Sequence, residues 1–556
     1  MSPSVVFQTN EISTPGGVPT STGVAFVVGL TDEGPPPSGP AYVYTQSISQ
    51  YVSAFGPRST TSATLYDWLD EYFHDGGQAA YISRVTDNSA TEATLTLQDS
   101  GPEPTVLVSA STAGTDGNNV YIVVSRGTAA TFSGTTTSSS EAVTAVSSFA
   151  NVGVGTYLTG TGIAAGTYVT AINASAQTLT LSANATTSGS KTLTPTTYTV
   201  LVENSAGNVL ETWGPFYVTS QLFAVTTSNY VTFTQSAGSG FTTNQPAVLT
   251  STALSGGANP NDIASASYVT ALANFPASLG PGTVAAPSQT NSTVWTGLLA
   301  HASANNRFAA LDTADGTTSA SVVTTVGSIG TTTTASCGIF TQGSLTIPGI
   351  TPGTTRTVAG SAAVAALRAQ VASTTSQNQA PCGIKWGLNY PLGFTTFFGP
   401  GGSWLQSDVN TMEQGGINCF ANFYGTLCLY GFVSPVPQTT DAVYWQSSAA
   451  CERMSLVNDG QAAVAPFLFD TIDGAGSTLT AFQTALKGVL NAHWAANALY
   501  GDTASDAGVV NILPPINTAA TAALGQLNAN LQVRISPYAD SVLVVITTVP
   551  LTATVV

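Results

Sequence analysis

Three histidines have the clearest potential for acid–base chemistry or metal binding: His74, His301 and His493. Each lies in or beside a predicted helix, and none has a second histidine four positions away, so the helical His pair of a zinc site is missing. His74-Asp75 is the best acid–base candidate. However, a histidine in the last turn of a helix interacts favourably with the helix dipole, and Asp-Gly-Gly is a helix stop signal. We therefore favour a structural role for His74.

Other chemical motifs in the sequence are incomplete. Asp312-x-x-Asp315-Gly316 lacks the remaining ligands of an EF-hand loop, and a strand-end Asp followed by an Asp-Gly turn explains it more simply. Ser188-x-x-Lys191 matches only the shortest part of a serine acylase motif. The sequence contains neither G-x-x-x-x-G-K-[ST] nor G-x-S-x-G. We therefore expect no enzyme activity, no cofactor and no metal site.

The cysteines are odd in number and widely spaced, and no C-x-x-C occurs, so the sequence indicates neither a zinc knuckle nor a disulfide framework. We expect small buried thiols in a reducing compartment. The five positions are Cys337, Cys382, Cys419, Cys428 and Cys451.

Charged residues are scarce. They make up 7% of the 556 residues, against roughly 25% in an ordinary soluble domain. The net charge of −17 and the lack of a basic patch argue against direct binding of nucleic acid or of an anionic membrane. We expect no secretory signal at the N-terminus, and the apolar run 542–546 is far shorter than the ~20 residues that span a bilayer. A surface with so few ions loses little when copies of the chain cover it, which favours a protein made to be packed against neighbours.

The hydrophobic periodicity predicts alternating strands and helices in much of the chain. A strand over 24–30, a helix over about 61–76 and a strand over 79–85 form an α/β unit, and residues 258–330 repeat the alternation. Further helices are expected over about 360–373, 440–457 and 478–500, and further strands over 508–513, 531–535 and 541–549.

Residues 131–197 differ in kind, because they hold one acid, Glu141, one base, Lys191, and a great excess of Thr, Ser, Gly and Ala. Their apolar residues alternate at period two, which predicts a small β module. The flanking segments 119–125 and 198–203 are predicted strands. The module is therefore expected to be inserted between two strands of one parent domain.

Several short segments, individually weak, occur in a recognisable order. They are Ser21–Gly29, Glu33–Pro35, Phe73–Val85, Ala285–Pro287, Ala310–Asp312, Val358–Gly360 with Ala366 and Arg368, Gly416–Asn418, Leu429–Gly431, Arg453, Ala498–Gly501, and Asn517-Thr518 with Gly525. This series resembles the tail sheath proteins of contractile bacteriophage tails, over nearly the whole chain apart from 131–197.

The resemblance implies a multidomain fold of mixed α/β and β class. An inner α/β domain would be formed by both chain ends, with a middle α/β domain and outer β-rich insertions. The expected division is 1–22, linking arm and inner strand; 23–105, middle domain, first part; 106–257, outer β-rich domain with its insert; 258–400, middle domain, second part; and 401–556, inner domain with a C-terminal linking strand.

The family also implies how copies join. Extended strands at both chain ends add to sheets of neighbouring subunits, so that backbone hydrogen bonds make the link. The expected linking residues are Val5, Val6, Phe7, Val542, Val544, Val545 and Ile546. The simpler alternative is that each segment is an ordinary edge strand of its own domain.

The implied partners are copies of the chain in six-fold stacked rings that form a helical polymer, a tail tube protein, and baseplate and terminator proteins at the two ends. The implied function is contraction that drives the tube through a host envelope during genome delivery. Such a protein would belong to the virion tail and be assembled in the bacterial cytoplasm.

From 401 onward only Arg453, Lys487 and Arg534 are basic, against ten acids, so these three are the candidate tube contacts.

Two other function classes remain open. A β-rich surface-layer or adhesin-type protein would account for the Thr/Ser/Gly-rich region, but not for the long helices of the last third. A glycan hydrolase would need a carboxylate pair in a cleft, and the sequence offers no such pair that can be aligned.

Overall fold

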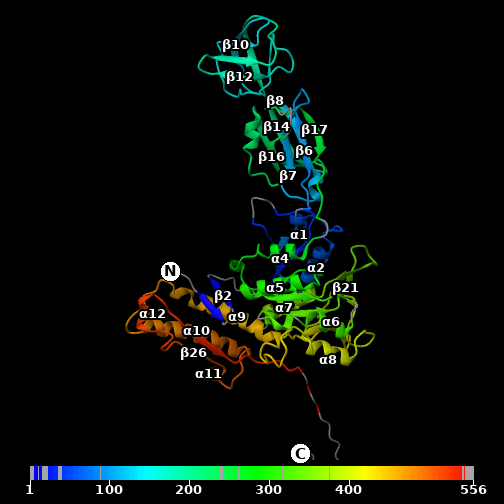
Figure 1. Cartoon of the computed structure of the whole chain (residues 1–556), viewed down its shortest axis with the longest axis vertical. Coiled ribbons are helices and arrows are strands. Elements are labelled where there is room, and N and C mark those ends of the chain that lie inside the picture. The colour runs from blue at the N-terminus through cyan, green and yellow to red at the C-terminus, as the bar shows by residue number, and fades with distance from the viewer. Residues whose placement is uncertain are drawn as a thin grey trace, which may run out of the picture.

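Apolar runs with almost no charge form the strands of an eight-stranded sheet in the middle of the molecule. The computed structural model describes residues 6–9 and 12–15 (backbone only), 23–35, 40–87, 89–237, 242–260, 263–315, 318–327, 329–332, 334–374, 376–540, 542 and 544. Figure 1 shows an elongated chain, in which two β units extend from one end of a broad base.

Six adjacent strands of the large sheet are parallel, and the strand at each edge is antiparallel. Parallel strands covered on both faces need continuous apolar runs, and Ala25–Val28 is fully buried accordingly. The order across the sheet is β25 (Thr426–Tyr430), β24 (Ile417–Phe423), β20 (Gly338–Gln342), β19 (Phe308–Asp312), β18 (Thr283–Ala285), β3 (Val24–Gly29), β5 (Ala79–Arg84) and β4 (Val43–Thr45).

Helices cover both faces of this sheet. Ala25 and Val27 point to a core shared with α1 (Ile48–Phe55), α2 (Ala63–His74) and α7 (Ser361–Thr374). Phe26 and Val28 point to the other core, built with α4 (Ser265–Leu272), α5 (Ser292–Ala304), α6 (Ser319–Val326) and α8 (Gln406–Gln414). Short 3-10 helices complete the body: η2 (Ala277–Leu279), η3 (Ile329–Thr331) and η4 (Ala335–Cys337).

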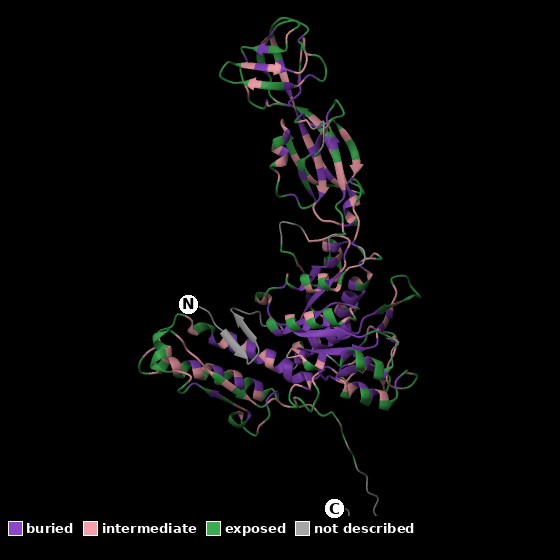
Figure 2. Cartoon of the chain, in the orientation of Figure 1, coloured by how far each residue is buried: buried purple, intermediate pink, exposed green. Residues whose placement is uncertain are grey.

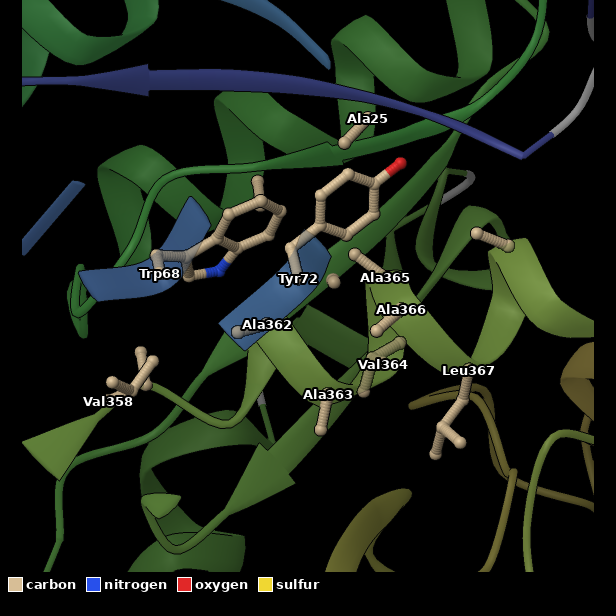
Figure 3. Close-up of a cluster of buried hydrophobic side chains, with 14 of the residues drawn as sticks. Ala25, Trp68, Tyr72, Val358, Ala362, Ala363, Val364, Ala365, Ala366 and Leu367 are labelled. Atoms are coloured by element: carbon tan, nitrogen blue, oxygen red, sulfur yellow. The ribbon is translucent and has the colours of Figure 1, made fainter. Parts of the chain in front are cut away.

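Alanine-rich α7 is buried along almost its whole length and packs against α2. Figure 3 shows Trp68 and Tyr72 of α2 beside Ala362, Ala365 and Ala366. The Trp68 indole donates a hydrogen bond to Ser361 Oγ at the start of α7 (2.9 Å). Small side chains on one helix therefore make room for large aromatic ones on the other.

Two β units stand beyond the body. The nearer one contains α3 (Thr219–Phe223), η1 (Thr115–Asn119) and strands β6 (Thr94–Gln98), β7 (Pro104–Ala110), β8 (Val120–Thr128), β15 (Val209–Phe216), β16 (Val231–Gln235) and β17 (Leu249–Ala253). The farther one contains β9 (Phe132–Thr136), β10 (Ala142–Thr144), β11 (Leu158–Gly160), β12 (Val169–Asn173) and β13 (Thr178–Leu181). The long strand β14 (Gly189–Asn204) pairs with β9 at its start and with β8 at its end, so it runs through both units. Each unit has its own hydrophobic core.

The last part of the chain forms a helical module: α9 (Ser447–Val464), η5 (Ala465–Phe467), α10 (Ser477–Ala495), α11 (Ala504–Ala507), β26 (Gly508–Asn511), α12 (Ala519–Ala523) and β27 (Asn530–Val533). Its core, which includes Phe482, Leu486 and Leu490 of α10, is separate from those of the large sheet. The hairpin of β1 (Val6–Thr9) and β2 (Ile12–Pro15) lies near α9 and α5, and β21 (Leu345–Pro348), β22 (Thr355–Val358) and β23 (Gly393–Phe394) form a small separate sheet.

The observed fold is a mixed α/β arrangement of several sheets, as expected, and Figure 2 shows its buried residues concentrated in the large sheet. Some boundaries differ from the expected ones. The expected boundary at 105 falls inside the β6–β7 hairpin, and the expected inner domain from 401 includes β24 and β25, which belong to the large sheet. The helix expected over 440–457 spans Ser447–Val464, and the one expected over 478–500 ends at Ala495, because Asn497 adopts a positive φ of 61° and the chain turns back.

Candidate assembly interface

In doubly wound α/β folds, ligands bind where the strand order reverses at the carboxyl edge, which here lies between β3 and β18. We call the segments that lead to the β units, 85–87, 89–93 and 254–260, the neck. At this edge the residues that follow β3 are covered by Arg84 and by the neck. Arg84 donates to the Thr31 carbonyl (3.2 Å), and Asn259 donates to Asp32 Oδ1 (2.7 Å). Burial, with a smaller contribution from neighbouring Asp116, raises the pKa of Glu33 to about 9. The polar groups at this edge therefore form hydrogen bonds with one another, and the edge supports the β units.

Asp312, at the end of β19, caps the first residue of α7. Its carboxylate accepts hydrogen bonds from the Ser361 amide and hydroxyl (both 2.8 Å) and from the Ser288 amide (3.0 Å). Burial raises its pKa to about 6. Asp315 accepts from Thr395 Oγ1 (3.1 Å), and Gly316 lies outside the described residues. In the described part of the chain, no cluster of three or more His, Cys, Asp or Glu side chains could hold a metal ion.

Two histidines have structural surroundings. His74 lies 2.7 Å from the Asp70 carbonyl and stacks on Tyr390, with ring centroids 4.0 Å apart. His301 accepts a hydrogen bond from Arg307 (2.7 Å), and burial together with that cation lowers its pKa to about 3. The His74 Nδ1 also lies 3.4 Å from Asp70 Oδ1, one helical turn before it, so the histidine is held at the end of its own helix.

His493 joins the two long helices of the C-terminal module. Its Nδ1 lies 2.5 Å from Glu452 Oε1 and its Nε2 lies 2.9 Å from Asp459 Oδ2, both on α9. Burial lowers the pKa of His493, but the hydrogen bonds to Asp459 and Glu452 outweigh burial and raise it to about 9. The imidazolium is therefore an ionic link between α10 and α9.

The cysteine side chains lie mostly inside the fold. All five cysteines are free, and four are buried, as expected, while Cys382 is half-buried. Burial raises the pKa of Cys382 and of Cys419 to about 12. Ser188 accepts a hydrogen bond from the Ser138 amide (2.9 Å), an ordinary loop contact.

The two-stranded sheet of β26 and β27 presents open edges. Val510, Leu531 and Val533 contribute to the core beneath α10. In the part of the chain that the structure describes, neither strand has a second strand partner. Unpaired edges are templates for strands from other chains, and a lone pair of strands is only marginally stable.

The segment 535–540, which we call the strap, leads from β27 to the C-terminal tail. The Ser536 amide donates to the Ala498 carbonyl (2.9 Å), and Asn378 donates to the Ser536 carbonyl (2.8 Å). Tyr538 donates to the Phe432 carbonyl (3.0 Å), and its own backbone is bonded to Gln446 in both directions. The strap thus fixes the point from which the tail leaves the body.

The expected linking residues fall at the two ends of the described chain. Val5, Val545 and Ile546 lie outside the described residues. Val6 and Phe7 belong to β1, whose strand partner in the structure is β2. Beyond the strap, Val542 and Val544 are 81% and 74% exposed.

The three candidate tube cations have different surroundings. Arg453 is half-buried, 5.0 Å above the Tyr444 ring and 3.3 Å from Cys337 Sγ, so it is engaged within its own chain. Lys487 and Arg534 are exposed on the C-terminal module.

Comparison with solved structures shows the fold. A sheath tail protein from Listeria innocua matches with a TM-score of 0.55 and 11% identity, covering 88% of this chain and 89% of that chain. A sheath tail protein from Desulfitobacterium hafniense matches with a TM-score of 0.50 and 10% identity, covering 88% and 90%. The contracted helical sheath of the anti-feeding prophage covers 96% and 94% at 11% identity, with a TM-score of 0.48. No protein-family model and no curated protein matches the sequence. The first two matches confirm that the chain has the sheath tail protein fold.

The sequence did not indicate the strap or the His493 link. Their partners are far apart in the chain: Glu452 and His493 are separated by 41 positions in the numbering, and Phe432 and Tyr538 by 106. The only sequence signal was the spacing of Glu452 and Asp459, which places both acids on one face of a helix.

Proposed function

We propose that this protein is the repeating subunit of a contractile tail sheath, which polymerises around a tail tube and shortens to drive the tube through a bacterial envelope. The observation that carries the proposal is the sheath tail protein fold, matched over 88% of the chain at a TM-score of 0.55. Delivery of a bacteriophage genome, with assembly in the host cytoplasm, is the specific form of the function that we propose.

The open sheet of the C-terminal module supports a linking mechanism. The tail beyond the strap, beginning with exposed Val542 and Val544, adds to the β26–β27 sheet of a neighbouring copy, and the segment around Val5–Phe7 adds to another. Because each added strand pairs through its backbone, copies remain joined while they rotate. The strap supports this role, since Tyr538 holds the start of the tail at a fixed place.

Contraction of this kind needs no nucleotide, because its free energy comes from new contacts between subunits. A surface with few ions suits such contacts, since burying hydroxyl and apolar groups costs less than burying unpaired charges.

The partners would be copies of the chain in six-fold rings, the tube, and baseplate and terminator proteins. With Arg453 engaged internally, we keep Lys487 as the leading tube contact. None of the helices in the described part of the chain has both the length and the hydrophobicity of a membrane span.

Negative-stain microscopy of the purified full chain tests the proposal. Striated hollow tubes are the expected result, and particles that stay monodisperse at all concentrations would overturn it.

A further inference from the structure

Phe469, in the loop between α9 and α10, combines strain with exposure. Its φ is 67°, in the left-handed region that bulky residues rarely adopt. Its side chain is 84% exposed, and among the described residues only Tyr424 shares both properties as an aromatic. Tyr424 carries a hydroxyl that water can bind, whereas Phe469 has no polar side-chain atom. Strained backbone held at an exposed apolar side chain points to a contact outside the chain.

A groove of about 460 Å³ lies just past the carboxyl end of α10. Trp494 and Leu499 provide apolar walls, and the Trp494 indole is fixed by its hydrogen bond to the Gly501 carbonyl (2.9 Å). Tyr500, which is 65% exposed, and Ala495 lie at its rim. The volume is sufficient for a phenyl ring.

Phe469 and the groove lie at opposite ends of one helix. The loop that follows Phe469 is tied to the first turn of α10, where the Ser477 amide donates to Asp473 Oδ1 (2.8 Å). The 19 residues of α10 span about 28 Å, and Figure 1 shows this helix along the C-terminal module. Phe469 therefore cannot fill the groove of its own chain. A contact between unlike ends of identical copies is heterologous and propagates into a ring or a helical polymer.

Charged side chains lie beside both Phe469 and the groove. Asp470 follows Phe469 and is exposed. Arg534 is exposed, and its backbone lies next to the groove residue Tyr500, whose amide donates a hydrogen bond to the Arg534 carbonyl (2.8 Å). Asp502 lines the groove itself, so an incoming Asp470 is attracted only on the side of the groove where Arg534 lies.

We propose that Phe469 of one copy inserts into the groove at the end of α10 in the next copy, with Asp470 facing Arg534. The contact rests on the proposed function, since it is a second, side-chain link within the same polymer. It assigns Arg534 to contacts between copies and leaves Lys487 for the tube.

Two variants test the insertion, each with a matched control. Phe469→Ala removes the inserted ring, and Ala495→Trp fills the groove from its exposed rim. Tyr424→Ala removes an equally exposed aromatic elsewhere, and Ala492→Trp adds the same bulk to α10 outside the groove. We expect the first pair to raise the concentration needed for polymerisation by about thirty-fold and the controls to match the wild type. Polymerisation of Phe469→Ala and Ala495→Trp at the wild-type concentration would overturn the proposal.

A charge exchange tests the polar part of the contact. Asp470→Arg and Arg534→Asp should each weaken polymerisation, and the double variant should recover most of it. Equal loss in the double variant would show that the two side chains do not meet.

Crosslinking separates this proposal from the proposed function, because it does not need polymers. Copies with Phe469→Cys are mixed with copies carrying Ala495→Cys under mild oxidation, with the wild-type chain as the background for Cys382. A disulfide-linked pair that forms only in the mixture is the expected result. If no such pair forms, the insertion is wrong, whether or not the wild type makes tubes.

Discussion

Nδ1 of His493 lies 2.5 Å from Oε1 of Glu452, which joins α10 to α9 inside the C-terminal module. Glu452 is completely buried, so removal of the histidine charge would leave a carboxylate without its cation. Breaking a buried ion pair in this way costs on the order of 3 kcal/mol.

The His493 link gives the module a defined pH dependence. The pKa of the histidine is about 9 in the folded chain, against an ordinary value of 6.5. Its contribution is therefore complete below about pH 6.5 and is lost as the pH rises through about 9. In urea titrations between pH 6 and 10, His493→Gln should be less stable than the wild type at pH 6, and the difference should shrink above pH 9. His74→Gln is the control, and a difference that does not change with pH would contradict the ionic link.

The alanine-rich surface of α7 should not tolerate larger side chains. Ala366 is fully buried in the core where α7 packs against α2. Ala366→Leu should lower the free energy of unfolding by about 1–3 kcal/mol. Ala462→Leu, at an exposed position of α9, should have little effect. Thermal unfolding of both variants measures the difference, and equal melting temperatures would argue against close packing.

The strap should control exposure of the C-terminal tail. Tyr538→Phe removes the hydrogen bond to the Phe432 carbonyl, at a cost of about 1 kcal/mol. Amide hydrogens of 535–540 should then exchange faster, while those of the large sheet stay protected. Tyr424→Phe, which alters an exposed hydroxyl, is the control. Unchanged exchange in Tyr538→Phe would show that this bond does not hold the strap.

Lys487 should affect binding to the tube and not folding. Lys487→Glu reverses an exposed charge on α10 and should weaken co-sedimentation with the tube protein, more so at low salt. Lys191→Glu reverses a charge in the distant β unit and should bind normally. Equal sedimentation of both variants would remove Lys487 as a tube contact.

Several parallel strands of the large sheet, such as 24–30 and 79–85, were predictable because each is a local apolar run, whereas 338–342 lies in a Thr- and Gly-rich stretch and was not predicted. The ends of the helices were harder to predict. The hydrophobic periodicity continued past Ala495, whereas the helix ends there because Asn497 turns the chain. Arg453 appeared to be a free cation from its sequence alone. Its contacts with Tyr444 and Cys337 depend on how α9 packs against the body, which no local pattern records. For the same reason the sequence pointed to neither Phe469 nor its groove.

Removal of the C-terminal tail tests the central claim most directly. The account predicts that the purified full chain forms striated hollow tubes in negative-stain images. A chain ending at Asp540 keeps the strap, so it should fold with unchanged thermal stability but remain as separate particles. Tubes formed equally well by the truncated chain would contradict the proposed linking of copies through their terminal strands.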